Sequence, residues 1–398
     1  MATRTTTTRT TQTGFVQSGD YVSLEEVFQA YLDCREGKRN KPGTIIFENN
    51  LRRNLIDLKE SLNNNTYRIG TTDYFILSKP KYREVWAACF RDRIVHRIIY
   101  NRVCQKYFRR FIFDSYACIP GKGPDKATKR LQSFLRGHNS QYFLQADIKN
   151  FFVSIDKNIL WDIVQGQMEG LDNLMYYIIF HDPTADYIFK GDKNLRKFVP
   201  KHKSLFNTSK DCGLPIGNLT SQLLANIYLD KVDKYVKHVL KCKKYIRYVD
   251  DLVILDSNPS KLHSMCFNLE SFLNNQLGLE FHPNKIQINK SEHGINFTGK
   301  IVKKYCMYPR KRVLNNLYSV DMLQDNFTIN GSINSYIGIL RQSNSWKIRS
   351  KLELYLNYYA YLMDWKLSKM VKPVRETNLY RLKLLNAVNQ LNFELKNF

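Results

Sequence analysis

The sequence predicts a mixed α+β fold, and three observations carry that prediction. Two apolar, β-rich runs at 244–247 and 252–255 are separated only by a short segment that contains Asp250 and Asp251. A third apolar run ends at Asp147, which also indicates a strand. Helical patterns, in which apolar residues recur every three or four positions, cover much of the remaining chain.

The first part of the chain is predicted to alternate helices with one pair of strands around a basic turn. The helices are expected from apolar periodicity, from a terminating run of Asn residues and from a Pro at the first position of the last helix. In order, the predicted elements are helices at 21–34 and 47–64, strands at 74–77 and 84–87, and helices at 91–111 and about 125–136.

The second part is predicted to carry the carboxylates on strands and to end in helices. Residues 181–212 are polar and Lys-rich, which indicates an insertion or long loop. The predicted elements are a strand within 141–155, a helix at 219–240, the Asp250 hairpin, a helix at 260–277, a β element at 295–299, and helices at 336–341 and 347–366. The last segment, 300–398, carries 17 Lys and Arg against 6 Asp and Glu, a balance of +11.

Composition favours a polyanionic partner. The chain of 398 residues has 61 Lys and Arg against 36 Asp and Glu, a formal net charge of +25, and 43% hydrophobic residues. Such an excess points to nucleic acid or to an acidic membrane surface. No apolar run approaches the 18 or more residues of a membrane span, so nucleic acid is expected and no membrane partner is. A membrane-surface protein is the alternative that charge alone leaves open.

The eight cysteines are widely spaced, and no CxxC or CxxH zinc pattern is present. They are therefore interpreted as reduced thiols, several of them in the core, of a cytoplasmic protein. Residues 1–20 form a Thr- and Arg-rich tail that is expected to be disordered. Transit peptides share that composition, so an organelle address is the alternative.

The carboxylates at strand ends are candidates for chemistry. Taken alone, Asp250 and Asp251 also fit a surface turn, and Asp147 also fits a helix N-cap. Together they supply three carboxylates beside apolar strands, where a cation is needed to neutralise them. Carboxylate oxygens suit Mg²⁺, so a two-ion magnesium site is expected.

The order of motifs resembles reverse transcriptases of the bacterial, group II intron-like type. Asp147 at a strand end, the segment 213–222 (GLPIGNLTSQ) and the segment 248–251 (YVDD) follow the order of that family's palm. The segments 279–285 and 295–299 look like its next two motifs. Upstream, Arg83 and the segments 92–96, 113–117 and 121–123 resemble its fingers. The resemblance covers roughly residues 45–365.

That resemblance implies a right-hand polymerase fold with an α-helical thumb. It places an N-terminal extension and fingers at 21–140, a palm at 141–300 with a fingers-like insertion at about 165–212, and a basic helical thumb and C-terminal tail at 301–398. The implied activity is RNA-directed DNA synthesis by two-metal nucleotidyl transfer, with two Mg²⁺ ions that Mn²⁺ could replace. The implied partners are an RNA template, a DNA or RNA primer and deoxynucleoside triphosphates. The resemblance also implies a cytoplasmic protein encoded by a bacterium or phage.

The family's residue roles transfer to matching positions of this chain. Asp147 and Asp250 would be direct metal ligands, with Asp251 supporting them, and all three count as catalytic. The other matches concern the incoming nucleotide and the leaving pyrophosphate, although each also fits a core or surface role. They are Arg83 as the triphosphate clamp, Phe152 as the steric gate against a 2′-hydroxyl, Pro215, Ile216 and Gly217 as the base-pair pocket, and Lys285 as a general acid.

One departure narrows the resemblance to a subfamily. Most reverse transcriptases have Gln-Gly where this chain has Ile216-Gly217. The form Ile-Gly-Asn-Leu-Thr-Ser-Gln looks like the enzymes of diversity-generating retroelements, which copy a template-repeat RNA with frequent errors opposite adenine. A structured template-repeat RNA and a small basic accessory protein are then the implied partners. The alternatives are another bacterial reverse transcriptase, of retron, phage-defence or group II intron origin, or a non-catalytic RNA-binding module.

Overall fold

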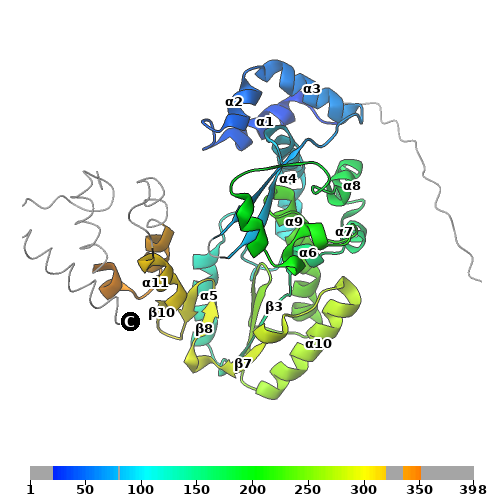
Figure 1. The fold of residues 1–398 in the computed structure, drawn as a ribbon. Helices are drawn as coiled ribbons and strands as arrows, with labels where there is room; N and C mark the ends of the chain where they lie inside the picture. The colour runs from blue at the N-terminus through cyan, green and yellow to red at the C-terminus, as the bar shows by residue number, and fades with distance from the viewer. Residues whose placement is uncertain (1–20, 79–80, 320–334, 351–398) are drawn as a thin grey trace, which may run out of the picture. The chain divides into compact units, whose positions relative to one another are not determined.

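The computed structural model describes residues 21–78, 81–319 and 335–350, and its helices and strands confirm the predicted α+β class. The chain divides into two compact units (Figure 1). The first unit comprises Met1–Arg110 and Asn150–Leu229, and the second comprises Phe111–Lys149 and Asp230–Phe398. Each unit is thus built from two separate stretches of the chain. The predicted tail at 1–20 and most of the predicted thumb lie outside the described residues.

The first unit begins with helices α1 (Leu24–Arg35), α2 (Pro42–Glu48), α3 (Leu51–Asn63) and α4 (Phe90–Arg110). Helix α1 packs on α4, and the two are joined by an ion pair of 2.7 Å between Arg102 Nε and Glu26 Oε1. The prediction of a single helix over 47–64 was wrong. Asn50 adopts φ −129° and ψ 46°, which is not helical, and the chain therefore starts a new helix at the next residue.

The first unit also contains a three-stranded sheet of order β2-β1-β4, from β1 (Thr72–Leu77), β2 (Arg83–Ala87) and β4 (Tyr187–Phe189). Strand β1 pairs antiparallel with β2, as the predicted hairpin requires, and parallel with β4. Strand β4 belongs to the segment 181–212, so this insertion is more ordered than the loop expected from its polarity. Buried Glu84 of β2 fastens the insertion by accepting from Ser204 Oγ at 2.6 Å and from the Leu205 amide at 3.0 Å.

The remaining helices of the first unit are short, except for the last. They are α6 (Phe151–Ser154), α7 (Lys157–Val164), α8 (Asp172–Phe180) and α9 (Leu219–Lys234), of which α9 continues past the unit boundary at Leu229. The helix predicted to reach residue 240 ends as a π-helical turn over Tyr235–Val239.

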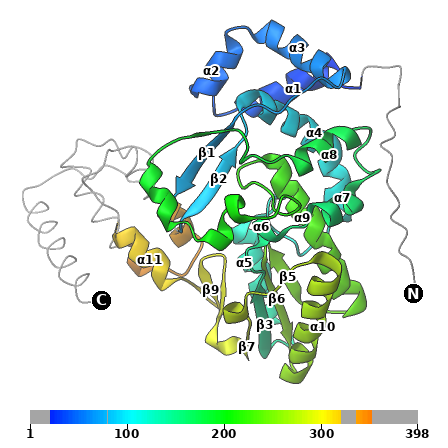
Figure 2. The same cartoon turned by 45° about the vertical axis from the view of Figure 1, so that its right-hand side comes forward.

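The second unit is built on a four-stranded antiparallel sheet of order β5-β6-β3-β7. Its strands are β3 (Tyr142–Asp147), β5 (Tyr245–Tyr248), β6 (Asp251–Asp256) and β7 (Gln287–Lys290). Helix α10 (Pro259–Leu277) lies along β3, β6 and β7 (Figure 2). Helix α5 (Pro124–Arg136) contributes Leu131 and Phe134 to a core that includes Phe143 and Val253 of the sheet.

A smaller antiparallel sheet completes the second unit, in the order β10-β9-β8. It comprises β8 (Ile295–Phe297), β9 (Lys300–Val302) and β10 (Met307–Pro309), and α11 (Lys311–Tyr318) follows. The boundary expected between palm and thumb at 300/301 falls inside β9. Of the two helices expected further on, the described part is helical at 335–341 and 346–350, and the rest of the second one lies outside the described residues.

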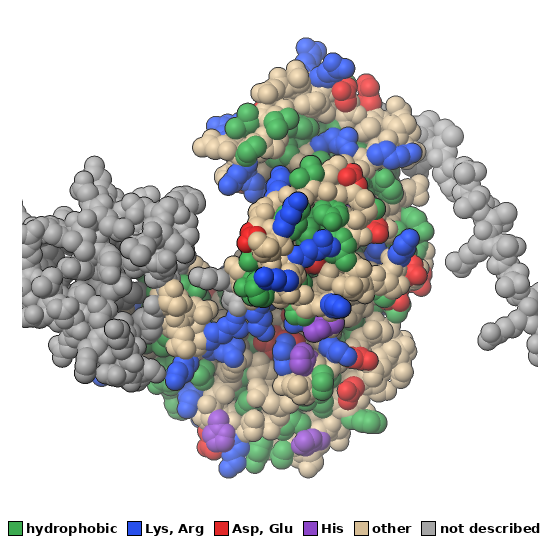
Figure 3. Space-filling view, viewed as in Figure 1, with side chains coloured by type: hydrophobic (Ala, Val, Ile, Leu, Met, Phe, Trp, Pro, Cys, Tyr) green, Lys and Arg blue, Asp and Glu red, His purple; other side chains and the backbone are tan. Residues whose placement is uncertain are grey.

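The surface of the described residues carries many Lys and Arg side chains (Figure 3), in keeping with the net charge of +25. Within the same residues, no helix combines the length and the apolar character that crossing a membrane would require. All eight cysteines are free, as expected, with Cys34, Cys104 and Cys242 buried and Cys118 exposed.

Candidate active site

The strand register of the second unit brings the predicted carboxylates together. Asp147, the last residue of β3, is the direct cross-strand partner of Asp251, the first residue of β6. Asp250 precedes Asp251 in the turn, and its carbonyl accepts a hydrogen bond of 3.3 Å from the Ile148 amide. Side chains that face each other across an antiparallel pair lie on the same face of the sheet. Residues more than a hundred positions apart therefore meet at one sheet edge.

The turn that carries Asp250 is held by a buried arginine. Val249 has φ +56°, a strained value for a β-branched residue. Arg247 is fully buried, and its Nη1 donates a hydrogen bond of 2.9 Å to the Val249 carbonyl. The same guanidinium pairs with Asp233, at 2.8 Å and 2.6 Å, and donates to Ser115 Oγ at 3.0 Å. The guanidinium network therefore fixes the backbone from which Asp250 projects.

Two glutamines that sequence reasoning missed orient Asp251. Gln145 Nε2 donates to Asp251 Oδ1 at 2.9 Å and to the Asn296 carbonyl at 2.8 Å. Gln287 Nε2 donates to Gln145 Oε1 at 2.8 Å. Because a carbonyl only accepts, the Asn296 contact fixes which end of the Gln145 amide faces Asp251. A signal was available in the sequence: Gln145 is a polar residue two positions before Asp147, and so on the same face of a buried strand.

Lys285 lies at the same sheet edge. It ends a 3-10 turn, Pro283–Lys285, whose start is tied to β3 by a hydrogen bond of 2.8 Å from the His282 amide to the Asp147 carbonyl. Its Nζ atom is 2.5 Å from Asp147 Oδ1, and both side chains are partly exposed. The structure thus brings Lys285 together with Asp147, Asp250 and Asp251.

The electrostatics of this cluster favour a cation. The pKa of Asp251 is raised to about 7, chiefly by burial and also by the charges of Asp147 and Asp250, against the lowering effects of the Gln145 hydrogen bond and of Lys285. As the side chains stand, no three His, Cys, Asp or Glu residues within the described ranges are arranged as metal ligands, and Asp147 is paired with Lys285 instead. Carboxylate oxygens are the donors that Mg²⁺ prefers, and a divalent cation would relieve their mutual repulsion. The donor set therefore fits such an ion.

The nucleotide-binding candidates lie in the first unit, where two hydrogen bonds bring most of them together. Phe152 of α6 is partly buried, and its carbonyl accepts a bond of 2.8 Å from the Leu214 amide at the start of the 214–217 loop. The Ile216 carbonyl accepts one of 2.7 Å from the Trp86 amide of β2. Arg83 is exposed at the first position of that same strand. The loop that holds Pro215, Ile216 and Gly217 is thus fastened to both α6 and β2.

Position 217 requires glycine, because the loop lies close to the backbone of β2 there. Its φ is +133°, and a Cβ atom there would lie 2.8 Å from the Trp86 carbonyl oxygen, which is too close for any side chain. The replacement Gly217→Ala is expected to displace the loop from β2 and to lower the free energy of unfolding by about 2–4 kcal/mol, from backbone strain and overpacking together. Thermal denaturation and hydrogen exchange of the Trp86 amide measure the two effects.

A matched control is Gly121→Ala, since Gly121 also has a positive φ, +73°, but open space where a Cβ atom would lie. That variant should show only the smaller conformational cost, about 1 kcal/mol. Equal destabilisation by the two variants would show that close packing against Trp86 is unimportant.

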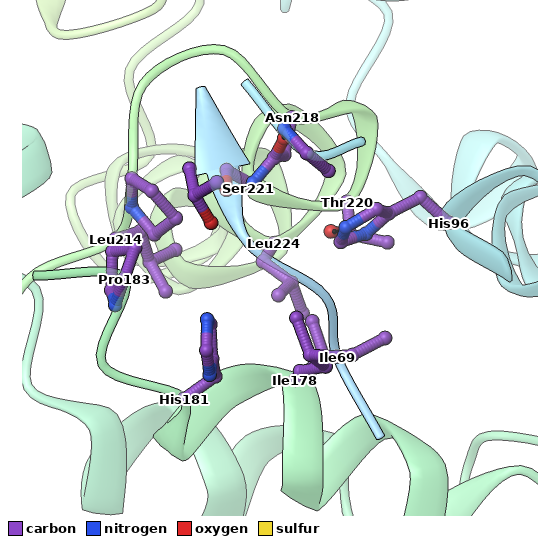
Figure 4. Close-up of a pocket in the computed structure, with 13 residues that line it drawn as sticks. Ile69, His96, Ile178, His181, Pro183, Leu214, Asn218, Thr220, Ser221 and Leu224 are labelled. Atoms are coloured by element: carbon purple, nitrogen blue, oxygen red, sulfur yellow. Dashed lines mark hydrogen bonds between the residues drawn. The ribbon is translucent and has the colours of Figure 1, made fainter. Parts of the chain in front are cut away.

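A small cavity of about 20 Å³ lies behind the 214–217 loop in the first unit (Figure 4). His181 points into it from the end of α8, and His96 Nδ1 lies 2.7 Å from Thr220 Oγ1 at its wall. Burial lowers the pKa of His96 to about 4 and also lowers the pKa of His181, so both are neutral at pH 7. The volume suits a single water molecule, so the cavity is too small for a nucleotide.

Comparison with known proteins decides the family. Residues 73–302, more than half of the chain, match the family model described as reverse transcriptase (RNA-dependent DNA polymerase). The chain belongs to the reverse transcriptase family. The matched range of this reverse transcriptase includes every residue of the carboxylate cluster and every nucleotide-binding candidate.

Individual relatives of this reverse transcriptase are distant. A putative COX1/OXI3 intron 2 protein of Saccharomyces cerevisiae is 21% identical over 308 residues, covering 62% of this chain and 34% of its own length. The chain therefore spans about a third of that curated relative. Two solved structures are similar: apo telomerase of Candida tropicalis, truncated from its C-terminal domain, and telomerase of Candida albicans with a fragment of telomeric RNA. Their TM-scores are 0.42 and 0.43, at 12% and 10% identity, covering 60% and 80% of this chain and 55% and 58% of theirs.

Proposed function

We propose that this reverse transcriptase copies an RNA template into DNA, extending a DNA or RNA primer with deoxynucleoside triphosphates. The observation that carries the proposal is the cross-strand pairing of Asp147 with Asp251, with Asp250 in the adjoining turn. Two Mg²⁺ ions, which Mn²⁺ could replace, would supply activation of the primer 3′-oxygen and stabilisation of the leaving pyrophosphate when bound. Asp147 and Asp250 would hold them, with Asp251 in support.

The protein's own groups then position and neutralise charge. Arg247 fixes the turn that carries Asp250, and Gln145 directs one oxygen of Asp251. Lys285 Nζ is the nearest ammonium group to Asp147, at 2.5 Å, and can deliver a proton to pyrophosphate as it departs. Lys285 occupies an Asp147 oxygen in this structure, so it would have to leave Asp147 before that oxygen could serve as an ion ligand.

We assign the incoming nucleotide to the residues that the 214–217 loop and β2 bring together. Arg83 is exposed, and its planar fork suits a triphosphate. Phe152 would exclude a 2′-hydroxyl, and Pro215 to Gly217 would line the pocket of the nascent base pair. The role of Phe152 is tested by the ratio of deoxynucleotides to ribonucleotides that the enzyme incorporates into the product. Equal incorporation of both would show that Phe152 does not exclude a 2′-hydroxyl.

We further propose that the enzyme makes adenine-mutagenised cDNA in a diversity-generating retroelement, with a template-repeat RNA and a small basic accessory protein as partners. Ile216 supports this proposal. It is partly exposed, and it lacks the amide donor and acceptor of the Gln that most reverse transcriptases carry there. Ile216 would make no hydrogen bond to a nascent base pair beside it, so one constraint on the geometry of that base pair would be absent.

The replacement Ile216→Gln is expected to lower misincorporation opposite adenine about fivefold, the equivalent of one net hydrogen bond of about 1 kcal/mol. Primer extension on a defined RNA with Mg²⁺, followed by deep sequencing of the cDNA, gives the error rates. Ile216→Leu is the matched control, since it changes shape without adding an amide, and it should keep the wild-type error rate. Equal adenine error rates in the wild type and the Gln variant would refute the role of Ile216.

A second candidate is an enzyme derived from an intron-encoded protein, which the similarity to the yeast intron 2 protein favours. The same sequencing experiment separates the two. Faithful cDNA from the wild-type protein points to the intron-derived enzyme, and errors concentrated at template adenines point to the retroelement.

A further inference from the structure

Phe113 is an exposed aromatic residue in an otherwise buried segment of the second unit. Its exposed fraction is 69%, while Asp114, Ser115 and Tyr116, which follow it, are all buried at 4% or less. The segment is anchored to the sheet, because the Tyr116 amide donates a hydrogen bond of 3.1 Å to the Arg247 carbonyl. The ring therefore projects from a rigid base into solvent.

Two cations lie beside this ring and are fixed there. Lys122 Nζ is 5.3 Å from the centre of the Phe113 ring and donates to the carbonyls of Phe113 and Ser115, at 2.6 Å and 2.8 Å. Arg130 Cζ is also 5.3 Å from the ring centre, and its Nε pairs with Asp114 Oδ1 at 2.8 Å. Both distances are within the range of cation–π contacts. An exposed fraction of 69% means that these cations leave much of the ring surface uncovered.

The local charge is positive. Lys122, Arg130 and Lys237 act on the buried carboxylate of Asp114, and Lys122 is also influenced by the buried Asp233 and Arg247. Four positive charges thus stand against two negative ones, a balance of +2. A flat, uncovered aromatic surface beside fixed positive charge is what a nucleobase and its phosphate require. Every base has an aromatic face, so such a surface recognises an unpaired base without regard to its identity, whereas the faces of bases inside a duplex are covered by their neighbours.

We propose that Phe113, with Lys122 and Arg130, forms a binding site for an unpaired nucleobase of a single-stranded nucleic acid. The base stacks on the free part of the Phe113 ring, and the adjoining phosphate is attracted by the two cations. This site rests on the proposed function, and it adds the place where an unpaired part of the template or primer is bound. Its binding is measured without nucleotides, so it can fail while DNA synthesis succeeds.

The test is equilibrium binding of a labelled single-stranded RNA, a single-stranded DNA of the same sequence and a blunt RNA–DNA duplex. Phe113→Ala is expected to weaken binding of a single strand roughly 5- to 150-fold, the range for loss of one stacked base. Binding of the duplex should be unchanged. If Phe113→Ala loses affinity only for single-stranded RNA, the bound base belongs to the template. If it loses affinity equally for single-stranded RNA and DNA, the base can belong to the template or to the primer. The loss should be the same at two salt concentrations, because stacking releases no counterions.

Phe267→Ala is the matched control, since Phe267 of α10 is also exposed, at 73%, and that variant should bind as the wild type does. Phe113→Trp should keep the affinity, and its added indole fluorescence, measured against the wild-type background, should be quenched when single-stranded RNA binds. Unchanged affinity of Phe113→Ala together with unquenched Phe113→Trp would overturn the proposal. An equal loss of duplex binding would overturn it too.

Discussion

The replacement Asp250→Asn is expected to reduce primer extension by at least about a thousandfold, the equivalent of about 4 kcal/mol of lost transition-state stabilisation. The change removes one negative charge from the cluster where Asp147 faces Asp251 across the strands, and so removes a ligand for the proposed ions. Because the amide keeps the size of the carboxylate, the turn held by Arg247 should stay in place. Single-nucleotide extension of a primer on RNA, under saturating substrate, measures the effect.

Asp256→Asn is the control for that experiment, because it makes the same chemical change at the other end of strand β6. Asp256 pairs with Lys261 at 2.8 Å, away from the cluster, and its loss should leave extension within about twofold of the wild type. Extension by Asp250→Asn at a rate near the wild type would favour a non-catalytic role for the carboxylate cluster.

The replacement Asp233→Ala is expected to lower the free energy of unfolding by about 3–5 kcal/mol, the usual cost of removing one partner from a buried ion pair. Arg247 and Asp233 are both fully buried, with Arg247 Nη2 and Asp233 Oδ2 2.6 Å apart. The Tyr245 hydroxyl also donates to Asp233 at 2.6 Å, so the variant removes the carboxylate partner of two buried groups, Arg247 and Tyr245. Denaturant unfolding, followed by circular dichroism, measures the loss.

Glu292→Ala provides the comparison, since Glu292 forms an exposed pair with Lys290 at 3.9 Å in the same unit. Its loss should cost at most about 1 kcal/mol. Extension by Asp233→Ala, measured well below its unfolding temperature, should also fall, because Arg247 holds the Val249 carbonyl of the turn that carries Asp250. A destabilised variant with full activity would separate the buried pair from the positioning of Asp250.

The parts of the site that lie close together in the chain could be predicted from the sequence. The hairpin around Asp250 and Asp251 is encoded by two apolar runs on either side of a turn, which is a local signal. Gly217 was expected to line the base-pair pocket, and the sequence did not indicate that a backbone group of this chain lies against it. That group is the Trp86 carbonyl.

Contacts between distant segments could not be predicted in this way. Gln145 and Gln287 are 142 positions apart, and only the pairing of β3 with β7 makes them cross-strand partners that support Asp251. Likewise, the polarity of residues 181–212 suggested a loop, yet hydrogen bonds from this segment to Glu84 attach it to the sheet of the first unit. A one-dimensional pattern records whether a side chain is polar, but not which group will satisfy it.

The sequence by itself determined the chemistry available to this protein: three carboxylates at or next to strand ends, an excess of cations and the apolar Ile216 beside Gly217. Those properties reside in single residues and their neighbours. The tertiary structure alone decided that Asp147 faces Asp251, that Arg247 and Gln145 hold the cluster in place, and that Phe113 projects beside two cations. The pairing of Asp147 with Asp251 follows from strand register, because a shift of one residue would turn each side chain to the opposite face of the sheet. The other arrangements follow from contacts between segments that are far apart in the chain.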